Sequence, residues 1–166
     1  MVFSRASRRQ MLTALGVGAA LPVLASCGSA TARSQKKFPI NLTDAEWRER
    51  LTSDQFYILR QAGTERPFTS PLDNEKRSGT FVCAGCENKL YSSEAKYDSR
   101  SGWPSFYQAI DKGAVGTSTD YKIGYPRTEV HCADCGGHLG HIFSDGPPPT
   151  GERHCINGLA MRFVAA

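Results

Sequence analysis

Two Cys-x-x-Cys pairs constrain the fold of this chain more than any other feature. The pairs are Cys83-Ala84-Gly85-Cys86 and Cys132-Ala133-Asp134-Cys135, and 45 residues lie between them. A tight turn can present both thiolates of such a pair to one metal ion, and two turns supply the four sulfur ligands of a tetrahedral zinc site. We therefore predict one structural Zn2+ ion, held by Cys83, Cys86, Cys132 and Cys135, which ties two distant parts of the chain together.

The alternative for the four cysteines is a pair of disulfides or a redox-active Cys-x-x-Cys. An oxidising compartment would favour disulfides. Export of a protein that has already folded would instead allow zinc to be loaded beforehand and retained. Metal analysis of protein purified without chelator separates the two interpretations.

Residues 1–40 differ from the rest of the chain. A basic start containing Arg8-Arg9 is followed by an apolar run from Met11 to Ala25. The run is too short for a membrane-spanning helix, which needs about 20 residues, and the arrangement is typical of an export signal. The arginine pair resembles a twin-arginine signal; an ordinary Sec signal is the alternative.

Cys27 ends the stretch Leu24-Ala25-Ser26-Cys27, which resembles the box of bacterial lipoproteins. In such proteins the signal is removed before the cysteine, which is then lipidated; alternatively, Cys27 belongs to a leader with no such role. We predict an export signal over 1–26, a flexible tether over 27–41 and one folded domain over 42–166. The expected location is the periplasm, either free or anchored to the membrane and facing the periplasm.

The net charge of +4 comes from the N-terminal segment. Six basic residues and no acidic one lie within residues 1–40, which leaves 14 basic and 16 acidic residues for the domain. A nearly neutral domain gives no argument for nucleic-acid binding.

The domain begins with helix signals and continues with strand signals. Thr43 and Glu46 have the spacing of a capping box and predict a helix over 44–51, and Ser53 predicts a second helix over 54–61. Short stretches rich in β-branched and aromatic residues predict strands over 79–83, 89–92, 114–120, 128–131, 139–143 and 154–164. The predicted fold class is mainly β (α+β): two small antiparallel sheets with short N-terminal helices, stapled into a single domain by the zinc knuckles.

Cys155 has no place in either Cys-x-x-Cys pair. It follows Arg153 and His154 directly, and cationic neighbours favour a thiolate, which is the nucleophilic form of cysteine. The alternative is a buried, unreactive cysteine in a strand. The sequence therefore makes Cys155 a candidate nucleophile.

Several segments together resemble the methionine-R-sulfoxide reductase B family, over residues 42–164. Besides the two cysteine pairs, they are Lys96-Tyr97-Asp98, Gly102-Trp103-Pro104-Ser105-Phe106, Gly137-His138-Leu139-Gly140-His141-Ile142-Phe143, Asp145-Gly146-Pro147-Pro148 and Gly151-Glu152-Arg153-His154-Cys155-Ile156-Asn157. The resemblance implies that Cys155 attacks the sulfur of methionine sulfoxide in oxidised proteins, releases methionine and becomes a sulfenic acid.

The same resemblance assigns roles to two histidines. His138 and His141 would hold and protonate the sulfoxide oxygen as the S–O bond breaks. In a regular strand they would point to opposite faces, but Gly140 permits a bulge that turns both to one face. The alternative is that they are structural residues or spare zinc ligands.

Four further residues would complete the site. The indole of Trp103 suits the methyl group of the substrate, and Phe143 would extend the apolar pocket; the alternative for Trp103 is a core position. Arg153 and Asn157 share a strand face with Cys155. Arg153 would favour the thiolate, and Asn157 would hydrogen-bond the substrate or orient a histidine.

Three positions depart from the family pattern. His154 stands where Tyr or Phe is common, Gly158 stands where Ser is common, and Ser101 stands where many members carry a resolving cysteine. The sulfenic acid on Cys155 is therefore expected to be reduced by an external thiol donor such as a thioredoxin-like protein. We expect a monomer. The competing functions are a non-catalytic zinc-binding module and a redox sensor or peroxidase that uses Cys155.

Overall fold

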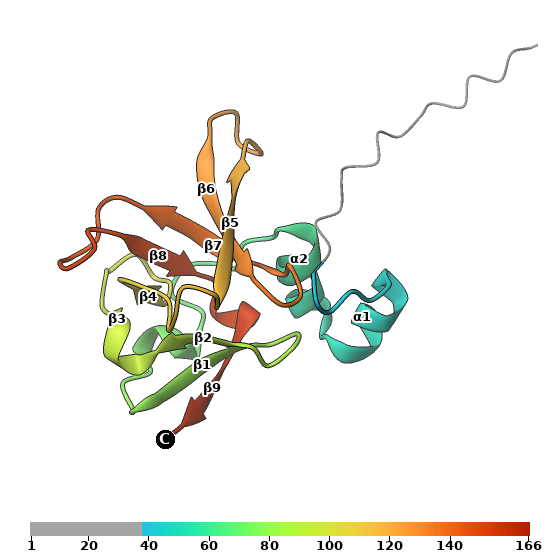
Figure 1. Ribbon diagram of the computed structural model, residues 1–166, viewed down its shortest axis with the longest axis horizontal. Helices are drawn as coiled ribbons and strands as arrows, with labels where there is room; N and C mark the ends of the chain where they lie inside the picture. The colour runs from blue at the N-terminus through green and yellow to red at the C-terminus, as the bar shows by residue number, and fades with distance from the viewer. Residues whose placement is uncertain (1–37) are drawn as a thin grey trace, which may run out of the picture. The chain divides into compact units, whose positions relative to one another are not determined.

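The computed structural model describes residues 38–166 (Figure 1). The predicted export signal over 1–26, lipidation of Cys27 and most of the predicted tether lie outside the described residues. Within 38–166, no helix has the length and apolar character needed to cross a membrane.

Two short helices open the domain, and both begin with a capping box. Helix α1 (Asp44–Arg50) is capped by Thr43, as predicted. Helix α2 (Ser53–Gln61) is capped by Thr52, one residue earlier than predicted, because Gln55 bonds back to the Thr52 amide. In each box the cap hydroxyl and the third helical side chain satisfy two backbone N–H groups that the helix leaves free.

In the described part of the chain, nine strands form two antiparallel sheets, which confirms the predicted fold class. The strands are β1 (Gly79–Cys83), β2 (Lys89–Ser92), β3 (Lys96–Tyr97), β4 (Ser105–Phe106), β5 (Val115–Asp120), β6 (Arg127–Cys132), β7 (His138–Phe143), β8 (Arg153–Ile156) and β9 (Met161–Ala165). One sheet has the order β2-β1-β9 and the other β3-β4-β8-β7-β6-β5. Residues 38–166 also contain three short 3-10 helices: η1 (Pro71–Asn74) precedes β1, η2 (Ser93–Ala95) joins β2 to β3, and η3 (Gly158–Ala160) joins β8 to β9.

The prediction of one strand over 154–164 is wrong. The chain leaves the six-stranded sheet after Ile156, turns through η3 and enters the three-stranded sheet as β9. The Ala160 carbonyl accepts a hydrogen bond from the Ala84 amide, which secures the turn beside the first cysteine pair. Strands β3 and β4 were not predicted, because two residues are too few to show an alternating pattern.

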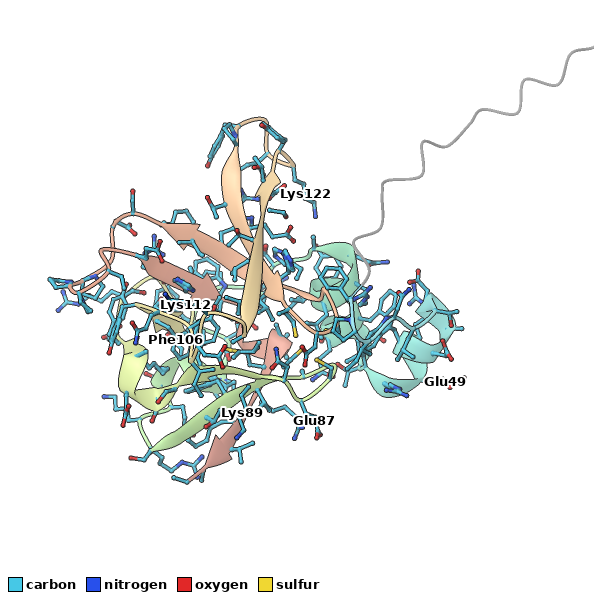
Figure 2. The ribbon with its side chains drawn as sticks, viewed as in Figure 1. Glu49, Glu87, Lys89, Phe106, Lys112 and Lys122 are labelled. Atoms are coloured by element: carbon cyan, nitrogen blue, oxygen red, sulfur yellow. The ribbon has the colours of Figure 1, made fainter. Side chains whose placement is uncertain are left out.

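Aromatic side chains of both sheets form the centre of the core. Phe81 of β1, Tyr91 of β2 and Phe106 of β4 are fully buried, and Phe106 lies inside the body in Figure 2. The Tyr91 and Phe106 rings stack with their centres 4.3 Å apart, and Phe81 meets Phe106 edge-on at 5.0 Å. Buried aromatic pairs of this kind hold the two sheets together.

Candidate functional site

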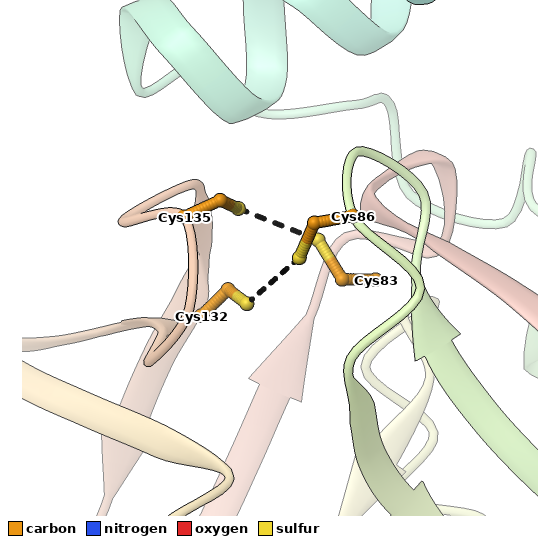
Figure 3. Close-up of side chains that lie close together, drawn as sticks. All are labelled: Cys83, Cys86, Cys132 and Cys135. Carbon is orange, nitrogen blue, oxygen red and sulfur yellow. Dashed lines mark hydrogen bonds between the residues drawn. The ribbon is translucent and has the colours of Figure 1, made fainter. Parts of the chain in front are cut away.

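The sulfur atoms of four cysteines meet in one cluster (Figure 3). All four lie within 4.8 Å of one another; the Cys83 and Cys135 sulfurs are 3.8 Å apart, and those of Cys86 and Cys132 are 3.5 Å apart. Zinc–thiolate bonds of about 2.3 Å in a tetrahedron separate the sulfurs by about 3.8 Å, whereas a disulfide requires about 2.05 Å. The spacing therefore fits a four-thiolate metal site and not a pair of disulfides.

The ends of two strands position the cluster. Cys83 is the last residue of β1 in the three-stranded sheet, and Cys132 is the last residue of β6 in the six-stranded sheet. Each knuckle closes with an amide, four residues on, donating to the carbonyl of its first cysteine: Glu87 to Cys83 and Gly136 to Cys132, both at 2.9 Å. Glu87 and Gly136 each have positive φ, which reverses the chain. The cluster therefore joins the two sheets at the ends of β1 and β6, which are both interior strands.

A row of polar side chains crosses one face of the six-stranded sheet. Directly paired residues run from β3 to β5 in the order Tyr97, Ser105, Cys155, His141, Glu129 and Ser118. Residues directly opposite in antiparallel strands share a face and lie about 5 Å apart at Cβ. The row places Cys155 beside a histidine on one side and a hydroxyl on the other.

The half-buried Cys155 has a mixed electrostatic environment. Burial raises the pKa of the Cys155 thiol, whereas a hydrogen bond from Ser101 and the positive charge of Arg153 lower it. The Ser101 hydroxyl lies 3.9 Å from the sulfur. The predicted effect of Arg153 on the thiol is thus present, but burial outweighs it in the free protein.

His154, which departs from the family pattern, lies on the other side of the strand from the thiol. Alternation along β8 turns His154 to the face opposite Cys155, where it is buried. Its Nδ1 lies 3.1 Å from the Tyr91 hydroxyl, and its Nε2 lies 3.1 Å from the Glu152 carboxylate. His154 therefore packs against the core and takes no part in the site.

A bulge brings the two predicted histidines to one face. Val130 pairs with Gly140 and His131 pairs with His138, so Leu139 is an extra residue in β7. The extra residue shifts the alternation, and the rings of His138 and His141 meet with their centres 5.3 Å apart. The bulge expected at Gly140 thus occurs one residue earlier and has the predicted result.

Each histidine is held by a carboxylate that sequence reasoning missed. His138 Nδ1 lies 2.7 Å from Glu129 Oε1, and His141 Nε2 lies 2.8 Å from Asp120 Oδ2. The hydrogen bond from His138 lowers the pKa of Glu129 to about 2, and burial lowers the pKa of His141. His138 Nε2 is buried and has no partner among the described residues, so it is free for a ligand.

Neither histidine joins the cysteine cluster. Among residues 38–166, the group that could hold a metal consists of the four cysteines alone. The alternative of spare zinc ligands therefore has no support in the geometry.

Trp103 sits on a loop at the edge of the row. Its indole Nε1 donates to the Glu65 carbonyl at 3.2 Å, and the ring is half-buried. The preceding Gly102 has φ of 86°, and its carbonyl accepts from the Phe68 amide at 2.7 Å. The core tryptophan of this domain is Trp47, which is 1% exposed, whereas Trp103 keeps an accessible face.

Asn157 holds the backbone on both sides of the site. Its Oδ1 accepts from the Glu65 amide at 3.0 Å, and its Nδ2 donates to the Leu139 carbonyl at 2.9 Å. Asn157 thereby joins the segment that holds Trp103 to the bulge that turns His138. The geometry gives it a positioning role, with both amide groups already engaged by backbone.

Arg153 and Phe143 form one unit beside the thiol. The guanidinium lies over the Phe143 ring at 4.4 Å and makes two hydrogen bonds to the Asp145 carboxylate, at 2.9 and 3.0 Å. Phe143 is 37% exposed, so part of its side chain remains accessible to solvent. Asp145 belongs to one of the segments that resemble the family, but its contact with Arg153 was not predicted from the sequence.

The structure explains Gly158. A Cβ atom at this position would lie 1.8 Å from Ser70 Oγ, so the absence of a side chain allows the segment before η1 to pack closely. The buried Glu65 carboxylate accepts from the Gly158 and Leu159 amides at 2.5 and 3.0 Å. Gly158 and Ser70 therefore form a matched pair.

A thiol beside two carboxylate-backed imidazoles defines a thiol-dependent enzyme, because the sulfur can attack while the imidazoles move protons. A SelR domain family matches residues 51–165. The peptide methionine sulfoxide reductase MsrB of Agrobacterium fabrum is 52% identical over 124 residues, covering 75% of this chain and 92% of that protein. The protein of the same name from Leptospira interrogans is 50% identical over 126 residues, covering 76% of this chain and 96% of that protein.

A plant protein shows similar identity. Peptide methionine sulfoxide reductase B1, chloroplastic, of Oryza sativa is 50% identical over 127 residues, covering 76% of this chain and 59% of that protein. The chain belongs to the MsrB family of peptide methionine sulfoxide reductases. The family resemblance inferred from the motifs is therefore confirmed.

Proposed function

We propose that this protein reduces the R epimer of methionine sulfoxide in oxidised proteins and passes through a sulfenic acid on Cys155. The observation that carries the proposal is the direct pairing of Cys155 with His141 across β8 and β7. The ring of His138 lies on the same face, with its centre 5.3 Å from the centre of the His141 ring. A nucleophilic sulfur and two imidazoles thus lie on one face of the six-stranded sheet. The R preference follows the family resemblance.

The first half-reaction moves oxygen from one sulfur to another. The Cys155 thiolate attacks the sulfoxide sulfur and forms a transient S–S bond. The oxygen then moves to the Cys155 sulfur as the S–S bond and the S–O bond of the substrate break, which leaves a sulfenic acid on Cys155 and releases methionine. The step takes up one proton, which His138 or His141 supplies to the oxygen. The carboxylates of Glu129 and Asp120 hold the two rings in orientation through their hydrogen bonds to His138 and His141.

The apolar part of the substrate would lie against Trp103 and Phe143. An indole face suits a methyl group next to a polar S–O bond. Arg153, which the Asp145 carboxylate and the Phe143 ring hold in place, would favour the attacking thiolate. Asn157 would keep Trp103 and the histidine bulge in register.

The second half-reaction needs an outside reductant. Ser101 is the side chain 3.9 Å from the Cys155 sulfur, and the other described cysteines all belong to the cluster. A thioredoxin-like dithiol would reduce the sulfenic acid, forming its own disulfide and water.

The four-cysteine cluster would hold one structural zinc ion. Its sulfur spacing fits the ion, and it lies where the two sheets meet. Bound zinc would fix this junction, and the reaction at Cys155 would take place elsewhere.

We also propose the twin-arginine signal over 1–26, the tether over 27–41 with a lipid anchor at Cys27, a periplasmic location and a monomeric state. The arginine pair supports the signal, and the lipoprotein-like box supports the anchor.

A turnover assay on a peptide containing both epimers of methionine sulfoxide, with a dithiol reductant, tests the proposal. The R epimer should be consumed and the S epimer should remain, and Cys155→Ser should abolish the reaction. A non-catalytic zinc module would show no turnover, and a redox sensor would oxidise Cys155 without producing methionine. Loss of both epimers at similar rates, or of neither, would contradict the proposal.

A further inference from the structure

A chain of three serine hydroxyls connects the Cys155 sulfur to the backbone of the Trp103 loop. The Ser101 hydroxyl lies 3.9 Å from the sulfur, and the Ser99 hydroxyl lies 2.8 Å from that of Ser101. The Ser105 hydroxyl lies 2.7 Å from that of Ser99 and donates to the Trp103 carbonyl at 3.0 Å. Four contacts in series therefore link the nucleophile to the residue that would carry the substrate methyl group.

The loop backbone holds these hydroxyls in place. The Asp98 carboxylate accepts from the Arg100 amide at 2.9 Å, and Arg100 and Gly102 both have positive φ, at 57° and 86°. The Ser101 amide also approaches the Ser99 hydroxyl at 3.4 Å. Ser105 is fully buried and paired with Cys155 across β4 and β8. The chain is thus built into the sheet and the adjoining loop.

The hydrogen bonds of the serine chain change direction when Cys155 ionises. With a thiol, the S–H and three O–H groups supply four hydrogens for four contacts, all directed toward the Trp103 carbonyl. With a thiolate, three hydrogens remain, and the charged sulfur is the strongest acceptor. Ser101 then donates to the sulfur, the bonds along the chain reverse, and the contact left without a hydrogen is the one at the Trp103 carbonyl.

We propose that Ser101, Ser99 and Ser105 act as positioning residues that stabilise the Cys155 thiolate and link its formation to the Trp103 loop. This deepens the proposed function, since it concerns the nucleophile of the same site, but it does not depend on the substrate. Each hydroxyl in the chain is oriented by the next, so removal of Ser99 weakens the bond that Ser101 donates to the sulfur.

The other groups around Cys155 leave a need for this donor. Burial disfavours the charged thiolate, and the positive charge of Arg153 is shared with the Asp145 carboxylate through two hydrogen bonds. Tyr97 on β3 and His141 on β7 are the titratable neighbours along the row. His141 is already bonded to Asp120. A neutral hydroxyl donor stabilises the thiolate without adding a titrating charge.

Alkylation of Cys155 by iodoacetamide, followed by mass spectrometry across pH 6 to 10, tests the proposal on the full chain. Ser101→Ala should slow alkylation at pH 7 by about tenfold, the value of one hydrogen bond to a charged group. Ser99→Ala should slow it by a smaller factor, about threefold, because it removes only the orienting partner. Toward the highest pH the rates should draw closer together, because a larger fraction of each thiol is then ionised.

Two controls separate this effect from general disturbance of the fold. Ser101→Thr keeps a hydroxyl and should restore the wild-type pH profile. Ser78→Ala removes an exposed serine outside the chain and should leave the profile unchanged. If Ser101→Ala matches the wild-type profile, Ser101 does not donate to the thiolate and the proposal fails. If Ser101→Ala slows alkylation but Ser99→Ala does not, the chain is not connected and the proposal also fails. Because alkylation needs no methionine sulfoxide, either result is independent of the proposed reductase activity.

Discussion

The five described cysteines occupy two regions that differ in what surrounds the sulfur. In the cluster, each sulfur lies within 4.8 Å of the other three, at the meeting point of two sheets, and Cys132 Sγ also accepts a hydrogen bond from Asn88 Nδ2 at 3.4 Å. At the reaction site, Cys155 lies in the middle of one sheet, beside a serine hydroxyl, a guanidinium and a histidine. Cysteine is thus grouped with other potential metal ligands in one region, and it lies beside hydrogen-bond donors and a positive charge in the other.

This difference shows how one residue type serves two purposes in a small domain. Four thiolates complete the coordination shell of a zinc ion and leave no open position, which is typical of a structural site. A lone thiol with proton donors nearby can attack and be regenerated. We therefore expect changes in the cluster to affect stability and changes around Cys155 to affect chemistry.

Cys132→Ser should have the largest effect, because it removes one of four metal ligands. The apparent free energy of structural zinc binding is about 10–16 kcal/mol, as large as the whole stability of a typical domain. We expect loss of bound zinc and loss of cooperative thermal unfolding, measured by metal analysis and circular dichroism. A variant that keeps the wild-type melting temperature would show that the cluster does not stabilise the fold.

Cys155→Ser should abolish activity while leaving stability and zinc content nearly unchanged, the reverse of what we expect for a change in the cluster. Activity should fall by at least about 10³-fold, as is typical when a nucleophile is removed. The serine is nearly isosteric, and the position is half-buried, so the melting temperature and the zinc content should stay close to those of the wild type. Initial rates and a thermal melt on the same preparation check both expectations. A large loss of stability would contradict the claim that Cys155 serves the chemistry and not the fold.

Glu129→Gln should change how stability depends on pH. Because the pKa of Glu129 is lowered to about 2 from 4.5, its contribution is fully present above pH 4.5 and is lost as pH falls toward 2. Allowing for its partial exposure, the contribution above pH 4.5 is about 2 kcal/mol.

The difference in unfolding free energy between the two proteins measures this contribution, and metal loss common to both cancels. The difference should be constant from pH 5 to 7 and shrink below pH 4.5. A difference that does not change with pH would mean that the carboxylate is not paired with His138.

Gly158→Ser should have the smallest effect, about 1 kcal/mol of lost stability from crowding against Ser70. Combining it with Ser70→Gly should recover part of the loss, although the Ser70 hydroxyl also caps η1 through the Leu72 amide. Chemical denaturation of the two single variants and the double variant gives the coupling. Strict additivity would show that the two positions do not form a matched pair.

Features with local signals could be predicted from the sequence. The cysteine pairs, the capping box at Thr43 and most strands depend on spacing within a few residues. The face on which His154 lies could also have been predicted, because neighbouring residues in a strand point to opposite faces. The imidazole is next to Cys155 in sequence but lies on the other side of the strand. Family resemblance supplied the roles of His138 and His141, and Gly140 suggested the bulge.

The missed features depend on register between distant strands. Asp120 and Glu129 reach the histidines only because β5, β6 and β7 pair in a particular register with one extra residue at Leu139. The serine chain requires β4 to lie beside β8, and β4 has only two residues. The end of β8 at Ile156 depends on contacts of Glu65 with η3, which lie more than 90 residues apart in sequence.

The separation of the two regions can be tested by mass spectrometry of protein that has reacted once with a peptide carrying methionine (R)-sulfoxide, in the absence of reductant. We predict one added oxygen on the peptide containing Cys155 and unmodified cysteines at 83, 86, 132 and 135. Ser101→Cys, which places a thiol where the hydroxyl lies 3.9 Å from the Cys155 sulfur, should instead give an internal disulfide and serves as the positive control. A disulfide between Cys155 and a cluster cysteine in the wild-type protein would contradict the account.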